Sequence, residues 1–302
     1  MTSLLALVLR THRIVRIDPA DGTVTTVTDE AGPSPDGIVL DGDRMYWTTM
    51  GAPIIDPDIP GEKGRDYSPR DGGVHSARLD GTDHVEVVPR GTLTTGKQIA
   101  SDGAGTLYWA DREGCKITRV RVDGTGLEDL IVHVRGDDWL QECVGVAVDP
   151  AHGALFWTQK GPAKGGQGAI FRAGLEIPPG EAPDNRSDIE VLWDGLPEPI
   201  DLEIVGDTLY WTDRGADDAG GNTVNRAPIP GPGQAGQPPE ILAGGFTEAI
   251  GLAVDEEAGV VYVSALGGDI VVVPLPDHPT ATRERRTLVS FGEPLSGLTL
   301  ER

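Results

Sequence analysis

Short apolar stretches alternate with polar turns along the whole chain, and they recur in a fixed order. A strand of small apolar residues comes first, an aromatic strand such as Tyr210–Asp213 second, and a third strand that ends in Asp-Gly, such as Asp123-Gly124. A fourth strand then mixes β-branched and polar residues. Asp-Gly favours tight hairpins because glycine accepts positive φ. This order predicts repeated units of four antiparallel strands.

An aromatic pair recurs in the second strand of the repeated unit, with copies 48 to 62 residues apart, although the first unit lacks it. These spacings suit a propeller blade built from four short strands. Small residues in the preceding strand fit an innermost position, where strands crowd around an axis. The copies are Tyr46–Thr49, Tyr108–Asp111, Phe156–Gln159, Tyr210–Asp213 and a degenerate Tyr262–Ala265.

The two chain ends supply a sixth unit. Ser296–Leu300 resembles an innermost strand with nothing after it, whereas Leu4–Leu9, Arg13–Ile17 and Thr23–Thr28 resemble the other three strands. Joining them removes the open strand edges of the seam. We therefore predict an all-β fold over residues 1–302: a single six-bladed β-propeller with four antiparallel strands per blade, closed by the C-terminal strand pairing with the N-terminal strands.

The repeats resemble the YWTD family, also called low-density-lipoprotein-receptor class B repeats. The family pattern is Gly-Leu-Ala-Val-Asp, then Tyr-Trp-Thr-Asp, then Ile-x-Arg-x-x-x-Asp-Gly, and it is matched from Leu4 to Leu300. The resemblance implies a six-bladed propeller of a stand-alone, bacterial-type member, and it leaves the function open. The motif aspartate is replaced by Thr49, Gln159 and Ala265. The family's structural arginine is matched by Arg16, Arg119, Arg172 and Arg226.

The formal net charge of −23 excludes whole classes of partner. Nucleic acid is not expected, because binding phosphates needs a basic stripe, and an anionic membrane is disfavoured for the same reason. The N-terminal apolar stretch lacks a basic leader and a cleavage site, so we expect a cytoplasmic protein. Cys115 and Cys143 fit a reduced compartment. Buried free thiols are the first expectation for them, with a disulfide or a nucleophile as alternatives.

Long loops should gather on one face of the propeller. The loop entering each innermost strand and the loop between the second and third strands share this face, which surrounds the channel mouth. Such loops include Met50–Gly73, Lys160–Gly168 and Arg214–Asn222. They are either surface insertions without function or the walls of a pocket. We favour the pocket, with a small-molecule ligand or substrate as the partner.

Carboxylates recur at the entry to the innermost strands. Glu142, Glu198 and Glu248 stand at equivalent positions, and Glu293 lies one place off that register. Like charges around a narrow channel raise one another's pKa or bind a cation. We therefore expect the first three as acid/base residues, or all four as a Ca²⁺ or Mg²⁺ site. The alternative is that they point to solvent or pair with nearby bases.

Further candidates come from the same predicted rim. His12 lies in the tight turn of the first blade, where it would shuttle protons or simply be solvated. Trp139 would stack on an apolar ligand or pack between loops. The expected substrate-binding residues are Lys97, Asp36, Asp201, Arg112, Trp139, Tyr67 and Arg65.

Two functions remain open. The first is a small-molecule enzyme of hydrolase, lyase or cyclase type, with channel-mouth carboxylates in acid/base or metal-assisted chemistry. Similar six-bladed propellers include strictosidine-synthase-like proteins and calcium-dependent lactonases, and this likeness of architecture implies such chemistry. The alternative is a non-catalytic YWTD propeller that binds a protein or a metabolite on the same face.

Overall fold

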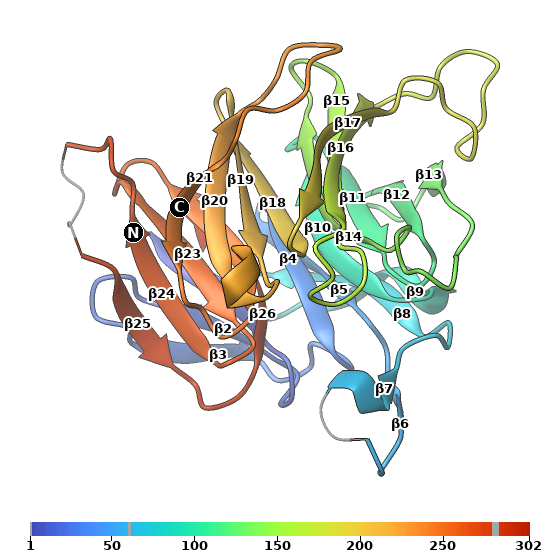
Figure 1. Cartoon of the computed structure of the whole chain (residues 1–302). Helices are drawn as coiled ribbons and strands as arrows, with labels where there is room; N and C mark the ends of the chain where they lie inside the picture. The colour runs from blue at the N-terminus through green and yellow to red at the C-terminus, as the bar shows by residue number, and fades with distance from the viewer. Residues whose placement is uncertain (1, 60–61, 280–283) are drawn as a thin grey trace.

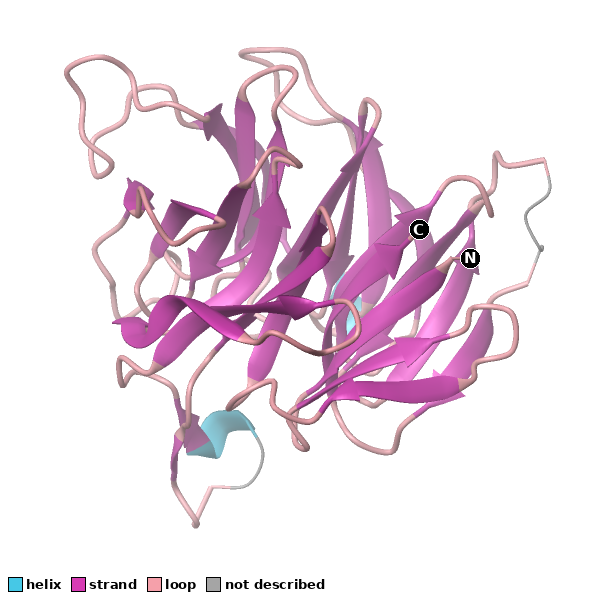
Figure 2. Cartoon of the chain, turned by 180° about the vertical axis from the view of Figure 1, so that it is seen from behind, coloured by secondary structure: helices cyan, strands magenta, loops and turns pink. Residues whose placement is uncertain are grey.

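The computed structural model describes residues 2–59, 62–279 and 284–302. In this part of the chain, six four-stranded antiparallel sheets stand as blades around a central axis (Figure 1), and the view from behind shows that nearly all the rest is loop (Figure 2). The innermost strands β26, β4, β10, β14, β18 and β22 contact one another in that cyclic order. The predicted all-β, six-bladed propeller is confirmed.

The blades are numbered from the chain ends. Blade 1 consists of β26 (Leu295–Glu301), β1 (Ser3–Val8), β2 (Arg13–Ile17) and β3 (Val24–Thr28). Blade 2 consists of β4 (Pro35–Asp41), β5 (Arg44–Thr49), β8 (Gly72–Arg78) and β9 (Val85–Leu93). Blade 3 consists of β10 (Gly96–Ser101), β11 (Thr106–Asp111), β12 (Lys116–Arg121) and β13 (Glu128–Val132).

The remaining blades follow the same order. Blade 4 consists of β14 (Cys143–Asp149), β15 (Ala154–Gln159), β16 (Gly168–Gly174) and β17 (Glu190–Leu196). Blade 5 consists of β18 (Pro199–Val205), β19 (Thr208–Asp213), β20 (Thr223–Pro228) and β21 (Glu240–Gly244). Blade 6 consists of β22 (Ala249–Asp255), β23 (Val260–Ala265), β24 (Asp269–Pro274) and β25 (Arg286–Ser290).

Blade 1 closes the ring from both chain ends. Strand β1 pairs antiparallel with β26, with Leu4 opposite Leu300 and Ala6 opposite Leu298, and the two ends of the chain lie near each other (Figure 1). These leucines belong to one buried apolar cluster together with Tyr262 and Val272 of blade 6. Burial of apolar surface thus joins the last blade to the first.

In blades 2, 4, 5 and 6, a hydroxyl group of the aromatic motif links the innermost strand to that of the next blade. Thr158 Oγ1 accepts a hydrogen bond from the Gly145 amide (2.7 Å) and donates one to the Ile200 carbonyl of blade 5 (2.9 Å). Both partners are buried, so the hydroxyl satisfies two backbone groups that would otherwise be costly. The equivalent residues Thr48, Thr212 and Ser264 make the same pair of bonds.

Glycine in the innermost strands follows from this close approach. A Cβ atom on Gly145 would lie 2.1 Å from the Ile200 carbonyl oxygen, and one on Gly297 would lie 2.4 Å from the Asp36 carbonyl oxygen. No side chain fits at such distances.

The outer part of blades 1, 3, 4 and 5 is held by the predicted structural arginines. Arg119 bonds Glu128 of its own blade (2.7 Å) and Glu176 in the loop of blade 4 (2.7 Å). Arg172 likewise bonds Glu190 of its own blade and the Pro230 carbonyl of blade 5. The tryptophans of the motif are buried in the blades, as predicted, at Trp47, Trp109, Trp157 and Trp211.

One mouth-side insertion has structure of its own. Between β5 and β8, the short strands β6 (Ile54–Ile55) and β7 (Arg65–Asp66) pair as a hairpin that includes the 3-10 turn η1 (Glu62–Gly64). The hairpin projects from the bottom of the propeller in Figure 1. Blade 5 carries a second turn, η2 (Asp217–Ala219), on the same face. The described part of the chain has no helix of the length and apolarity needed to cross a bilayer.

The hydroxyl bridges predict a measurable stability effect. Thr212→Val keeps the shape of the side chain but leaves the Asp201 amide and the Ile250 carbonyl without this partner. We expect a loss of about 1–3 kcal/mol in the free energy of unfolding, measured by urea denaturation. Thr212→Ser retains the hydroxyl and is the matched control. Equal stability of the two variants would contradict a structural role for the bridge.

Candidate functional site

The rim of the channel is built by one backbone bond that repeats in every blade. The residue directly after each second strand donates its amide to the carbonyl of the residue directly before the innermost strand, as in Arg112 to Thr95 (3.1 Å) and Arg214 to Glu198 (3.0 Å). The bond fixes where these side chains start. The six equivalent rim residues are Leu9, Met50, Arg112, Lys160, Arg214 and Leu266.

A cavity of about 210 Å³ opens inside this rim, and we call it the mouth cavity. Every rim residue except Lys160 lines it. The β6–β7 insertion contributes Arg65 and Tyr67, and the innermost strands contribute Asp36, Lys97 and Ile250. Leu9, Arg10, Pro294 and Glu248 complete the lining.

The mouth cavity is basic although the protein is strongly acidic. Its two acidic side chains are Asp36 and Glu248, and its five basic side chains are Arg10, Arg65, Lys97, Arg112 and Arg214. Low-dielectric walls strengthen the field of such a cluster. The arrangement is therefore suited to an anionic ligand.

The floor of the cavity holds a buried ion pair. Lys97 Nζ lies 2.6 Å from Asp36 Oδ1 and 3.4 Å from the sulfur of Met50. The side-chain amide of Gln98 donates to the other Asp36 oxygen (3.3 Å). Burial lowers the pKa of Lys97, although the Asp36 charge opposes the change and Arg112 and Arg214 add to it. Loss of solvation is thus the main influence on this amine.

The two rim arginines are held by neighbouring side chains. Arg112 bonds Glu113 (2.6 Å), and its guanidinium lies 5.6 Å from the centre of the Tyr67 ring. Arg214 Nε bonds Glu198 (2.8 Å), whose side chain is fully buried. Planar guanidinium groups fixed in this way are well suited to bind carboxylate or phosphate.

The predicted carboxylates share one end of the channel, but each has a cation beside it. Glu142 pairs with Lys160 (3.0 Å), Glu198 with Arg214, and Glu248 with Lys164 (3.6 Å). Glu293 pairs with Arg13 (2.8 Å). Within the described ranges, no three His, Cys, Asp or Glu side chains are placed to hold a metal ion. The geometry therefore gives no support to the expected Ca²⁺ or Mg²⁺ site.

The structure gathers most of the other predicted residues. Glu248 and five of the expected substrate-binding residues line the mouth cavity; those five are Asp36, Arg65, Tyr67, Lys97 and Arg112. Trp139 does not line it and is 50% exposed, with a left-handed φ of 55°. His12 is likewise exposed in its turn, with a φ of 53°.

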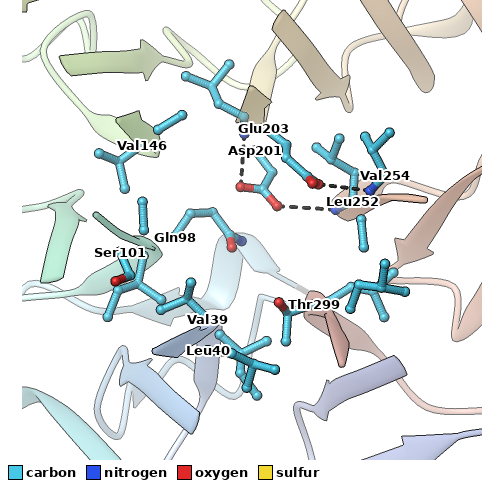
Figure 3. A pocket seen from close by; sticks show the side chains of 18 of the residues that line it. Val39, Leu40, Gln98, Ser101, Val146, Asp201, Glu203, Leu252, Val254 and Thr299 are labelled. Carbon is cyan, nitrogen blue, oxygen red and sulfur yellow. Dashed lines mark hydrogen bonds between the residues drawn. The ribbon is translucent and has the colours of Figure 1, made fainter. Parts of the chain in front are cut away.

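Asp201 lies deeper than expected, in a second cavity of about 460 Å³ further along the channel (Figure 3). At its position four blades have glycine, whereas blade 3 has Gln98 and blade 5 has Asp201, and both side chains line this cavity. Asp201 accepts hydrogen bonds from the Leu202 and Leu252 amides, and Glu203 accepts one from Val254 (Figure 3). Burial raises the pKa of Asp201 and of Glu203 to about 8.

The two cysteines do not supply a nucleophile. Cys115 and Cys143 are buried and not joined by a disulfide, and burial raises the pKa of the Cys115 thiol to about 11. Burial also raises the pKa of Cys143 well above its usual value. Both thiols are therefore protonated near neutral pH, and the thiolate is the reactive form.

Sequence reasoning missed part of the lining. Arg10, Met50, Arg214 and Leu266 line the cavity but were not among the expected binding residues. The signal was available, because every rim residue directly follows the four-residue aromatic motif or its equivalent in blade 1. That single position, compared around the ring, identifies Met50, Arg214 and Leu266, whereas Arg10 stands one residue after the rim residue of blade 1.

Sequence relatives of known name identify the family of this chain. A protein of Pyricularia oryzae named low-density lipoprotein receptor-related protein 1 is 41% identical over 285 residues, which cover 88% of this chain and 86% of the relative. The chain belongs to this YWTD propeller family. A 3-hydroxyacyl-CoA dehydrogenase-like protein, LAM1, of Cochliobolus heterostrophus is also 41% identical over 78% of this chain, which spans only half of LAM1. No family model matches the chain.

Solved structures show the same propeller at low sequence identity. This protein is similar in structure to a chain of the nidogen–laminin complex, with a TM-score of 0.70 and 18% sequence identity. The match covers 99% of this chain and 98% of that one. A putative 6-phosphogluconolactonase from Bacteroides uniformis has a TM-score of 0.54 and 13% identity, with 93% and 81% coverage. These likenesses establish the fold alone.

The buried channel acid predicts a pH dependence of stability. Because the pKa of Asp201 is raised from 3.8 to about 8 in the folded state, the unfolded chain loses its proton first as the pH rises. Its contribution to stability is therefore fully present below the unfolded value and declines until the pH passes the folded value. Asp201→Asn removes this decline, so the stability of the variant relative to wild type should rise across that window.

Urea unfolding of wild type and Asp201→Asn from acidic to mildly alkaline pH measures the effect. Asp184→Asn, at an exposed position, controls for the loss of a surface charge. Parallel curves for wild type and Asp201→Asn would show that the channel acid is not coupled to folding.

Proposed function

We propose that this YWTD propeller binds a small organic anion in the mouth cavity and acts on it by acid/base chemistry. The observation that carries the proposal is the convergence of five basic side chains on one small cavity in a protein of net charge −23. A surface selected only for solubility in so acidic a chain would not concentrate bases at the channel axis.

The size of the cavity limits the ligand. At roughly 30 Å³ for each water in the liquid, 210 Å³ holds about seven water molecules. This volume suits a small organic acid better than a nucleotide or a peptide. The apolar residues of the lining, among them Met50, Ile250 and Leu266, would contact its carbon skeleton.

Roles for individual residues follow from their surroundings. Arg65 and Arg112 reach the cavity from the insertion and the rim, and they would hold the anionic group of the ligand. Lys97 and Asp36 form an ion pair at the floor, so they would exchange a proton with the ligand. Of the three glutamates expected as catalysts, only Glu248 lines the cavity, and it would act there as a second proton-transfer group.

The names of the relatives are compatible with an enzyme but do not identify a reaction. LAM1 is called dehydrogenase-like, yet this chain matches only half of it, so that activity could belong to the other half. The lactonase neighbours share the fold at 13% identity. The proposal therefore depends on the mouth cavity and not on these names.

A second candidate is binding of a protein on the same face. Large apolar side chains are exposed on two mouth-side segments, the β6–β7 insertion and the loop before β14. Such exposure marks interaction surfaces in many soluble proteins. The exposed residues are Ile54, Ile55, Ile59, Val134 and Trp139.

Calorimetric titration of the purified chain with succinate, phosphate and the uncharged succinamide tests the first candidate. We expect saturable binding of an anion that weakens as ionic strength rises, and no binding of succinamide. Arg65→Met should weaken anion binding at least about tenfold, since a charged hydrogen bond contributes roughly 1.5–3 kcal/mol. The control Arg121→Met makes the same charge change at an exposed site outside the cavity.

Two results would count against an anion site: equal weakening by Arg65→Met and Arg121→Met, or no binding of either anion. The first would reduce the effect to overall charge. The second would favour the protein-binding candidate.

A further inference from the structure

Lys97 has the surroundings of a nucleophilic amine. Its side chain is 10% exposed, and it enters the mouth cavity from β10 at the cavity floor. Thr48 of blade 2 donates a hydrogen bond to the Lys97 carbonyl (2.5 Å), so the backbone that carries the amine is fixed by the bridge between blades 2 and 3. We propose that Lys97 forms an imine with the carbonyl carbon of a small oxo acid bound in the mouth cavity. This inference rests on the proposed anion-binding function.

Apolar side chains and two cations surround Lys97, in addition to its ion-pair partner Asp36. Met50 contacts Nζ through its sulfur, and Val144, Ile200 and Ile250 form a buried apolar cluster at the same level of the channel. Arg112 and Arg214 lie near enough to disfavour a further positive charge. An apolar pocket and adjacent cations are the two known ways to obtain a neutral, reactive lysine.

Asp36 is placed to move the proton that this chemistry requires. One of its oxygens lies 2.6 Å from Nζ, and the other is fixed by the Gln98 amide. The carboxylate can therefore take a proton from the ammonium group without changing its orientation. Gln98 acts as a positioning residue, because it contacts Asp36 and not the amine.

The step balances with these groups alone. Asp36 takes a proton from the Lys97 ammonium, and the neutral amine attacks the carbonyl carbon to form the C–N bond. Asp36 then protonates the resulting alkoxide, and it accepts a proton from the nitrogen. It returns that proton to the hydroxyl as the C–O bond breaks. The products are the protonated imine, one water and the Asp36 carboxylate, and no oxidant or reductant is needed.

The ligand class follows from the same residues. The carboxylate of the oxo acid would pair with Arg65 or Arg112 at the rim while its carbonyl faces Lys97 at the floor. A ligand in this orientation must be short, because the cavity holds only about seven waters. Pyruvate and 2-oxoglutarate are suitable probes of this class.

Reductive trapping tests the imine directly. The whole chain is incubated with pyruvate and sodium borohydride, digested, and mapped by mass spectrometry. We expect one reduced pyruvate adduct per chain, on Lys97, and at least tenfold less adduct in Lys97→Arg, which keeps the charge but cannot form an imine. Lys63→Arg, at an exposed position of the insertion, should leave the adduct unchanged.

Asp36→Asn provides an independent reading. It should slow trapping at least tenfold at neutral pH and shift the pH profile of trapping, whereas a purely structural Asp36 would change stability without changing that profile. If Lys97→Arg does not fold, the site of modification in wild type decides. An adduct spread over surface lysines, or none, would overturn the proposal.

Binding separates this inference from the proposed function. Lactate carries the same carboxylate as pyruvate but has no carbonyl group. If both bind equally and no adduct forms, the imine is wrong and the anion site stands. If neither binds and no adduct forms, both proposals fail. If pyruvate binds at least tenfold more tightly than lactate and forms the Lys97 adduct, both are supported.

Discussion

The contact between neighbouring innermost strands is the constraint on which the rest of this propeller depends. Six wedges must approach the axis closely, and a hydroxyl bridge joins the innermost strand of four of them to the next wedge. At blade 1 the bridge is changed: Ser296 bonds the Pro35 carbonyl with its own side chain (2.7 Å). Blade 3 has Ala110 where blades 2, 4, 5 and 6 have threonine or serine, so its aromatic motif offers no hydroxyl to the innermost strand of blade 4. There the two blades are joined by apolar packing and, further out, by the bonds of Arg119 to Glu176. The bridges also fix the height at which each innermost side chain enters the channel.

That fixed height explains why the polar groups of the channel separate into two sites. Asp36 and Lys97 stand at the level occupied by Val144, Ile200 and Ile250 in blades 4 to 6, directly below the rim. One residue further along, glycine is replaced only by Gln98 and Asp201. Gln98 therefore lies between the two levels and bonds Asp36 above it. The polar side chains of both sites stand where the sequence departs from the repeat, as expected where a fold tolerates local rule-breaking for function.

The blades and their closure could be predicted from the sequence, because the spacing of the repeated motifs fixes which strands pair. The aromatic pairs, the blade closure by Leu4–Leu9 and Ser296–Leu300, and the arginine contacts all depend on spacing, which the sequence states. The rim chemistry depends on rotamers and neighbours, which it does not state. Glu142 and Glu198, for example, do not point into the mouth cavity. Each pairs with the base that directly follows the aromatic motif of its own blade, Lys160 and Arg214 respectively. Asp201 was placed too high because it stands three residues after Glu198, about 10 Å further along a strand that rises roughly 3.3 Å per residue.

The electrostatics of the mouth cavity resolve an apparent conflict between overall and local charge. The many acids on the outside of the protein repel anions at long range, but salt screens that repulsion over about 8–10 Å. Inside the cavity the bases would act at contact distance and beside low-dielectric walls, so the local field would outweigh the overall charge. Burial also acts on Lys97, because it disfavours the ammonium form and lowers the pKa, whereas the Asp36 charge 2.6 Å away opposes that change. The proposed anion site and the buried amine beneath it thus depend on one feature, the close approach of the innermost strands, which buries Lys97 below the rim.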